Sequence, residues 1–122
     1  MIKHNVTATN MELTEAISDY LTKRLTQLEK FVDKDSEAIA RVEVGKISNH
    51  HHKGEIFRAG ITIDIEREQF RAEAETTDLY SAIDTMKEEV IHEITRASKK
   101  RKHLLKRGHQ KIKDMMRRWT GR

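Results

Sequence analysis

The sequence predicts an α+β fold in which two helices cover one face of a four-stranded sheet. Four segments alternate apolar and polar residues with period two, as half-buried strands do. Two other segments carry apolar residues at spacings of three and four, which is typical of amphipathic helices. Along the 122 residues the order is strand, helix, three strands, helix. One helical layer on one sheet is the economical way to bury these stripes in a single small domain.

The first strand is expected at residues 2–9, where Ile2, Val6 and their alternating neighbours indicate a half-buried strand. A helix is expected over residues 14–32, because apolar residues recur on one side and charged residues occupy the other. The polar residues 33–36 end this pattern and form a connection.

Three further strands are predicted at residues 38–47, 54–66 and 68–75, each with apolar residues at every second position. The connections between them are short enough for antiparallel hairpins. The largest side chains that we expect in the core of the sheet and of the last helix are Phe57, Ile61, Ile63, Tyr80 and Ile83.

The last helix is expected to begin near Thr77 and Asp78, which suit a helix N-terminus, and to end at Arg107 before Gly108. Such a helix would reach ~45 Å, whereas a body of ~95 residues is about 32 Å across. Its last turns should therefore project beyond the sheet.

The chain divides into a domain at residues 1–107 and a basic amphipathic tail at residues 108–122. The tail carries apolar residues at helical spacing, which predicts a third, short helix. Packing is the commoner role of such a stripe, although it could also stack on a base or anchor in a protein groove. The stripe consists of Ile112, Met115, Met116 and Trp119.

The net charge of +4 conceals two unlike parts. Residues 1–95 hold 12 Lys and Arg against 19 Asp and Glu, a charge of −7, whereas residues 96–122 hold 12 against one, a charge of +11. Such an asymmetry indicates a polyanionic partner for the basic end. The helix dipole favours one or two cations in the last turn, but it does not account for seven.

Like charges on one helix repel unless a phosphate backbone supplies the counter-charge, and counterion release then drives binding. Cations on the first helix would extend this surface if the two helices pack side by side. A merely solvated helix end is the alternative. The candidate RNA-binding residues are Lys23, Arg24, Lys30, Arg96, Lys99, Lys100, Arg101, Lys102, Lys106 and Arg107.

Signatures of enzymes are missing from the sequence. Without cysteine there is no thiolate metal site and no cysteine nucleophile. The five glycines form neither a phosphate loop nor a dinucleotide fingerprint. We therefore expect neither catalysis nor a cofactor, and no small-molecule substrate. His50 and His52 could contact one ion, but no third ligand stands at a telling spacing, so we expect no metal site.

Neither a membrane span nor a secretory signal is visible, which favours a cytoplasmic protein without a membrane partner. A membrane-surface role for the basic tail is the weaker alternative.

Two stretches of the chain resemble a known family. Residues 7–31 resemble its first strand and helix, and residues 73–86 resemble the entry into its last helix. The most specific part runs from Asp78 to Asp84 and is similar to the family pattern Asp-Met-Tyr-x-Ala-Ile-Asp/Asn. The family is that of the ribosome hibernation promoting factors, also called ribosome-associated inhibitor or sigma-factor modulation proteins. The resemblance covers about residues 1–107.

The resemblance implies a β-α-β-β-β-α fold, topologically similar to double-stranded-RNA-binding domains. It also implies a factor that docks on the rRNA of the small ribosomal subunit near the decoding region. There it would block the mRNA and tRNA sites, silence translation and preserve idle ribosomes, without cofactor or catalysis.

Four candidate residues match basic positions of the family: Arg24, Lys30, Arg96 and Lys100. Three positions that are commonly basic in the family are Thr9, Glu89 and His92 here. We therefore expect the basic surface to have moved from the helix middle toward the helix end. The alternatives are a general double-stranded-RNA binder and a protein-interaction module acting through residues 112–119.

Overall fold

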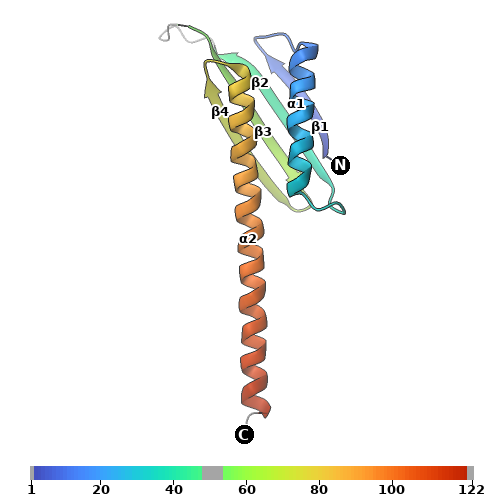
Figure 1. Ribbon diagram of the computed structural model, residues 1–122, viewed down its shortest axis with the longest axis vertical. Coiled ribbons are helices and arrows are strands. Elements are labelled where there is room, and N and C mark those ends of the chain that lie inside the picture. Colours follow the sequence, from blue (N-terminus) through green and yellow to red (C-terminus); the bar gives the residue numbers. More distant parts are fainter. Residues whose placement is uncertain (1, 48–53, 121–122) are drawn as a thin grey trace.

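The computed structural model describes residues 2–47 and 54–120, with the side chains of 118–120 left out. It confirms the α+β fold and the expected order of elements (Figure 1). Along the chain these are β1 (Ile2–Thr9), α1 (Glu15–Leu28), the 3-10 turn η1 (Glu29–Phe31), β2 (Ala38–Ile47), β3 (Ile56–Ile65), β4 (Glu68–Thr76) and α2 (Leu79–Thr120).

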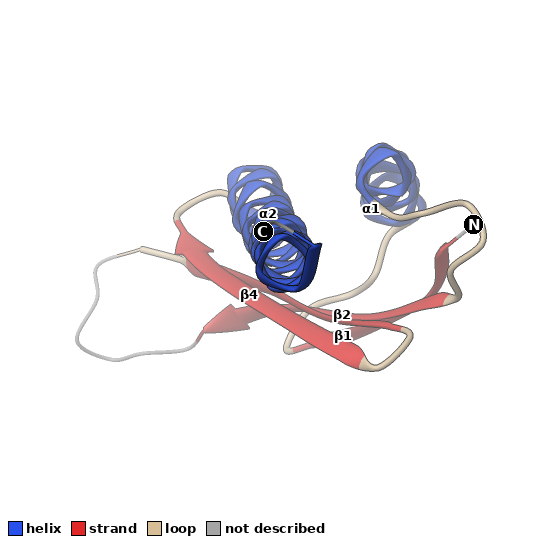
Figure 2. Ribbon diagram, turned by 90° about the horizontal axis from the view of Figure 1, so that it is seen from below, coloured by secondary structure: helices blue, strands red, loops and turns tan. Residues whose placement is uncertain are grey.

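The four strands form one sheet in the order β1-β2-β3-β4. β1 runs parallel to β2, and the two hairpins that follow are antiparallel, as predicted. Gly45 faces Thr9 across the parallel pair, where a Cβ atom would lie 3.1 Å from the Thr9 carbonyl oxygen. Both helices lie on the same face of the sheet, and Figure 2 shows them side by side above it.

The core lies between this helical layer and the sheet. From α1, the side chains of Ile17, Leu21, Leu25 and Leu28 are buried. Alternate residues of β2 and β3 are buried on the face of the sheet that the two helices cover. Ile61, Ile63 and Ile83 are buried as predicted, whereas Phe57 is half-buried. α2 begins where the sequence indicated, because the Asp78 carboxylate accepts the Ser81 backbone N–H at 3.1 Å.

Two aromatic residues are exposed: Tyr80, which was predicted to lie in the core, and Phe31. Tyr80 is 38% exposed, because it stands in the first turn of α2 and turns toward α1 instead of the sheet. Its ring meets that of Tyr20 edge to face, with 4.8 Å between centroids. Phe31 is 46% exposed, because α1 ends at Leu28 and the chain continues as η1.

The predicted break at Gly108 is wrong, since α2 runs through it without interruption to Thr120. A glycine inside a helix costs ~1 kcal/mol relative to alanine. Lys106, Arg107 and Gln110 around it are good helix formers, and no proline stops the helix. The tail is thus part of α2, not a third helix, and the division of the chain at residue 107 stays a prediction.

The projection of the helix end is confirmed, and it is longer than expected. Ile94 is the last buried residue of α2, and Ala97 is the last that packs against the core. The 42 residues of α2 span ~63 Å, so the part after residue 98 extends away from the body (Figure 1). We call residues 99–120 the projecting end.

Leu21 should be among the most sensitive positions, because its side chain is fully buried between α1 and the sheet. We expect Leu21→Ala to lower the free energy of unfolding by about 2–5 kcal/mol, measured by urea denaturation. Lys23→Ala, on the exposed side of the same helix, should change it by less than ~0.5 kcal/mol. Equal losses in the two variants would contradict the packing described.

Candidate nucleic-acid interface

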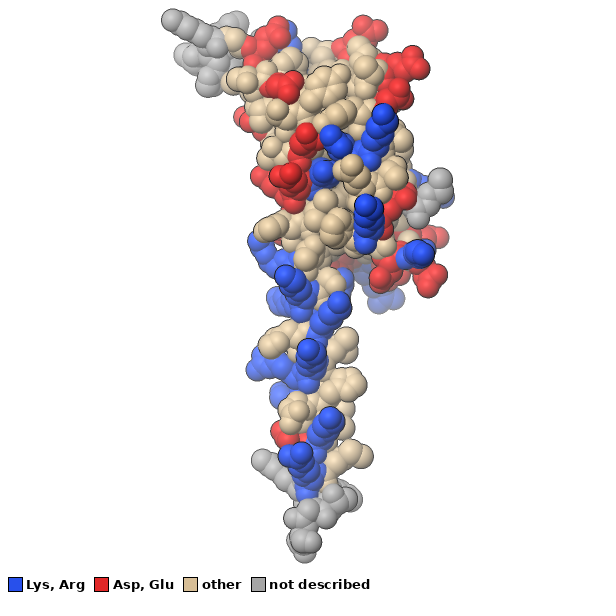
Figure 3. Space-filling model, in the orientation of Figure 1, with Lys and Arg blue, Asp and Glu red and all other residues tan. Residues whose placement is uncertain are grey.

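The basic residues of α2 gather where the helix leaves the sheet. All seven predicted cations of this helix are exposed. Figure 3 shows Lys and Arg following the projecting end, whereas the body carries both signs and most of the Asp and Glu. We call this set the basic cluster: Arg96, Lys99, Lys100, Arg101, Lys102, Lys106 and Arg107.

Six of these residues lie on the sides of α2 that do not face the sheet. At 3.6 residues per turn, Lys99, Lys100 and Arg107 point away from the direction of the buried Ile94. Arg101 points toward that direction instead, and its guanidinium forms an ion pair with Glu68 of β4. Arg101 is therefore the member of the basic cluster with a counter-charge on the sheet.

The middle of α2 is acidic. Glu88 and Glu89 are exposed there, and with Glu93 they line a shallow hollow beside Arg71. His92 is exposed in the same hollow. Arg96 of the basic cluster lines the same hollow and forms an ion pair with Glu93 at 3.2 Å. The three carboxylates outnumber the two arginines here, which disfavours a phosphate backbone. That the basic surface is displaced toward the end of the helix stays a prediction.

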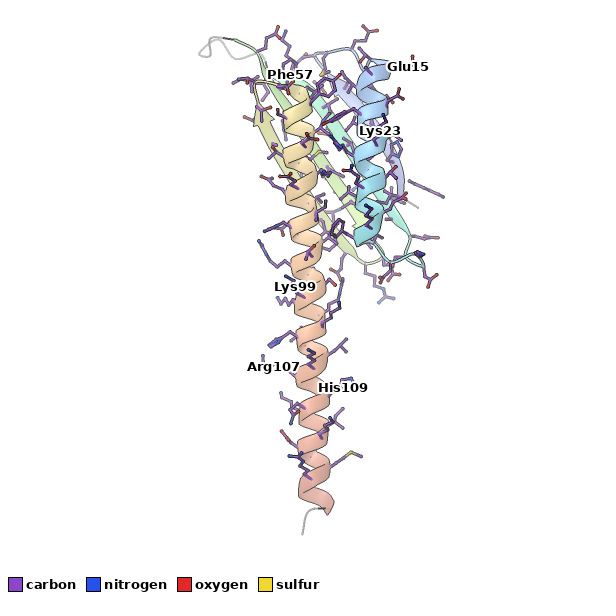
Figure 4. The ribbon with its side chains drawn as sticks, viewed as in Figure 1. Glu15, Lys23, Phe57, Lys99, Arg107 and His109 are labelled. Atoms are coloured by element: carbon purple, nitrogen blue, oxygen red, sulfur yellow. The ribbon has the colours of Figure 1, made fainter. Side chains whose placement is uncertain are left out.

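Two of the predicted cations near the first helix, Lys23 and Lys30, are exposed. Lys23 is exposed on α1, which covers the sheet, and in the view of Figure 4 it lies above Lys99 and Arg107 of α2. Lys30 is exposed in η1, next to Phe31, whose side chain lies against the exit of α2. Lys30 itself lines a hollow with Ile2 of β1 and Thr26, so its place in the basic surface stays a prediction.

Arg24 is held by contacts within the protein. Its Nε donates to the Asp84 carboxylate at 2.8 Å, and Nη2 donates to the Tyr20 hydroxyl at 2.8 Å. The Tyr20 hydroxyl donates in turn to Asp84 at 2.7 Å. The bond to Tyr20, followed by that to Asp84, raises the pKa of Arg24. We call these three residues the interhelix clamp, because they join α1 to α2.

Tyr20 and Asp84 were not predicted as partners of Arg24. The signal was present, because Tyr20 and Arg24 stand four apart on α1, and Asp84 closes the motif at the start of α2. What sequence does not show is that these two helix faces meet. Desolvation, together with Asp84, raises the pKa of Tyr20 against the lowering effect of Arg24.

The projecting end also carries exposed apolar side chains. Met115 was expected to pack, but it is 64% exposed, and the side chain of Trp119 lies outside the described residues. These residues lie on the side of α2 opposite most of the basic cluster. We call them the apolar stripe: Leu104, Leu105, Ile112, Met115 and Met116.

The arrangement is suited to binding, through one cationic face and one apolar face. Within residues 2–47 and 54–120, no three His, Asp or Glu side chains converge as metal ligands. His50 and His52 lie outside the described residues. None of the helices described is long and apolar enough to cross a bilayer.

The interhelix clamp makes a specific contribution to stability. Tyr20→Phe removes the hydroxyl that accepts from Arg24 and donates to Asp84, while the direct Arg24–Asp84 pair remains, so we expect the free energy of unfolding to fall by about 1 kcal/mol. Tyr80→Phe is the matched control, because it keeps the ring contact and its hydroxyl has no protein partner in the described chain. A loss as large in Tyr80→Phe would mean that the hydrogen bonds of the Tyr20 hydroxyl make no specific contribution.

Comparison with known proteins agrees with this fold. A ribosome hibernation promoting factor of Escherichia coli K12 is 26% identical over 98 residues, which cover 80% of this chain and 95% of that protein. A ribosome hibernation promotion factor of Staphylococcus aureus strain COL is 28% identical over 116 residues, which cover 92% of this chain and 57% of that protein.

Solved structures give the same result. The crystal structure of the Thermus thermophilus Protein Y N-terminal domain matches with a TM-score of 0.65 and 28% identity, over 77% of this chain and 97% of that one. A ribosomal subunit interface protein from Coxiella burnetii matches with a TM-score of 0.55 over 78% of this chain and 97% of that one. Its 12% identity makes that likeness one of fold alone.

A family model described as Sigma 54 modulation protein / S30EA ribosomal protein matches residues 4–102, which is most of the chain. That description names a modulation protein and a ribosomal protein, and neither is a class of enzyme. The match confirms the resemblance carried by residues 7–31 and 73–86. The chain therefore belongs to the Sigma 54 modulation protein / S30EA ribosomal protein family.

Proposed function

We propose that this protein is a ribosome hibernation factor that binds rRNA of the small subunit and silences translation by occupying the decoding region. The observation that carries this proposal is the exposed basic cluster on a helix that extends away from an acidic body. The names of the relatives from Escherichia coli and Staphylococcus aureus support the biological role.

Binding would be electrostatic at its core. Cations of α2 would contact phosphates, and release of condensed counterions would supply most of the free energy. The acidic middle of α2 would be repelled by the same phosphates, so the protein would approach RNA with its helix end. Lys30 would widen the contact, while Arg24 would mainly hold α1 against α2.

Silencing would follow from occupancy. A folded body placed where mRNA and tRNA bind would exclude them without breaking or forming a covalent bond. This mode of action needs neither cofactor nor small-molecule substrate, and it places the protein in the cytoplasm with the ribosomes.

A general double-stranded-RNA binder is the main competing function. It would prefer the small subunit no more than a plain RNA duplex of equal charge. A competition assay at fixed salt separates the two functions, because non-specific phosphate binding weakens steeply with salt. Retention of the small subunit against excess duplex at 0.2 M salt is the outcome that we expect.

Lys99 and Lys100 provide the sharpest test of the basic cluster, because both are exposed and have no ion pair with a residue of the described chain. We expect Lys99→Glu with Lys100→Glu to weaken small-subunit binding at least tenfold at physiological salt. The slope of log affinity against log salt should fall by about two.

Lys3→Glu with Arg71→Glu is the matched control, because it makes the same change in net charge on exposed residues of the sheet. The control should bind nearly as the unchanged protein does. Equal effects in both double variants would mean that net charge, and not the helix end, determines binding.

The biological role is testable by sedimentation of tagged protein from growing and starved cells through sucrose gradients. We expect the protein in small-subunit and ribosome fractions of starved cells. Its absence from ribosomal fractions under both conditions would overturn the proposed function.

A further inference from the structure

The apolar stripe continues the buried side of α2 beyond the sheet. Ile112 comes five helical turns after the buried Ile94, so both side chains point in the same direction. Leu105 and Ile112 are 63% and 59% exposed, however, because the sheet ends before it can cover them. An amphipathic helix gains most of its stability from packing its apolar side. Leu105 and Ile112 are the residues of this side that are left without a covering element in the described chain.

The stripe ends in a concave corner. Where α2 leaves the sheet, a groove of about 860 Å³ opens between the helix, η1 and the β3–β4 turn. Phe31, Val32 and Ile65 line it from the body, and Ile94 and Leu105 line it from α2. One wall is thus the sheet-facing side of the helix, and the other is the end of the sheet.

The shape and the polarity of this corner select among partners. A flat bilayer could not reach the helix wall, because the sheet stands on the same side of α2 as the stripe (Figure 2). The charged residues that line the corner balance one another, Asp33, Glu66 and Glu68 against Arg67, Arg101 and Lys102, so it offers a phosphate backbone no net positive charge. A protein segment of the width of a helix, about 10 Å across, would contact both walls.

We propose that the occupant is the projecting end of a second copy of this chain, running antiparallel about a two-fold axis near Gly108. About such an axis, Leu104 of one copy faces Ile112 of the other. Residues 98–105, which border the groove, then face residues 111–118. Each helix end would lie in the corner of the other copy, and the interface would be isologous.

Gly108 suits the crossing point. It lies on the same side of α2 as Leu105 and Ile112, and a Cβ atom placed there would meet nothing within 4 Å. A mid-helix glycine weakens the helix relative to alanine. Without a side chain, however, it lets a second backbone approach closely.

Charge favours the antiparallel pair over a parallel one. The loop after η1 and the β3–β4 turn present acids that have no ion pair within the described chain. An antiparallel helix end would bring toward them Lys111 and Lys113, which flank Ile112. A parallel pair would place two basic ends together without these acids. Screening limits such attraction to about 8 Å at physiological salt, so the local pairs matter most. The acids are Asp33, Asp35, Glu37 and Glu66.

The area available is that of a modest dimer. Five apolar residues, each between 46% and 64% exposed, would be covered in each copy. Covering them in both copies removes on the order of 1,000 Å² of surface, near the lower limit for a specific interface. We therefore expect a dimer at micromolar concentrations. The five are Phe31, Leu104, Leu105, Ile112 and Met115.

Sedimentation equilibrium of the full chain tests the dimer without ribosomes, and so independently of the proposed function. We expect a monomer–dimer equilibrium at tens of micromolar protein. Ile112→Asp should raise the dimer dissociation constant at least tenfold. His103→Asp is the matched control, since it adds the same charge on the exposed opposite side of α2 and should leave the equilibrium unchanged.

Single cysteines test the orientation, because the chain has none of its own. Leu104→Cys and Ile112→Cys chains, mixed under mild oxidation, should form the mixed disulfide faster than either self-paired one. His103→Cys should form none above background. Faster self-pairing of both Leu104→Cys and Ile112→Cys would indicate a parallel pair and overturn the proposal. A chain that stays monomeric to ~200 μM would overturn it too, whether or not it sediments with anionic vesicles or RNA.

Discussion

The burial of one side of α2 against β3 and β4 is the constraint on which the rest of the structure depends. Leu79, Ile83 and Val90 fix the helix along the sheet, and Ile94 closes this contact. Strands of nine or ten residues extend ~33 Å, about half the ~63 Å of α2. A helix that begins beside β4 and follows the sheet must therefore leave it. The position of every residue after 98 follows from this difference in length.

The same constraint separates the charges. The packed half of α2 carries Glu88, Glu89 and Glu93, and the projecting end carries most of the cations. In the proposed complex, the acidic body would keep phosphates away from the sheet, and attraction would be concentrated at the helix end. The interhelix clamp also reduces the free positive charge of the body, because Asp84 pairs with Arg24 of α1. The net charge of +4 does not reveal this separation of acidic and basic residues along the chain.

Much of the fold was predictable, since alternating and helical spacings are properties of single segments. The strands at 38–47 and 68–75 were found within a residue of their ends. The predictions failed where the outcome depends on which element packs alongside, or on the sum of several small helix propensities. By its spacing Tyr80 belongs to the apolar side of α2 that packs on the sheet, but its ring contacts Tyr20 of α1 instead. Gly108 resembles a helix end, but its cost is small beside the preference of its neighbours for helix.

The candidate site was predictable to a similar degree. The exposed cations of α2 lie where helical spacing placed them, because an exposed helix face is determined by its own sequence. Arg24 and Arg101 differ, since each has a counter-charge on another element, Asp84 and Glu68. Long-range pairs of this kind depend on packing, which no single segment records. The contacts of all these cations with rRNA stay predictions.

Arg101 shows how one helix can carry two opposite faces. It is the member of the basic cluster that points toward the sheet side, between Ala97 and Leu105. An unpaired cation there would interrupt the apolar side of α2. Glu68, at the start of β4, supplies its counter-charge. The body thus neutralises the one cation on that side and fixes the helix as it leaves the sheet. The opposite side keeps its positive charge, which the proposed function assigns to rRNA, and the apolar side stays exposed for the proposed second copy.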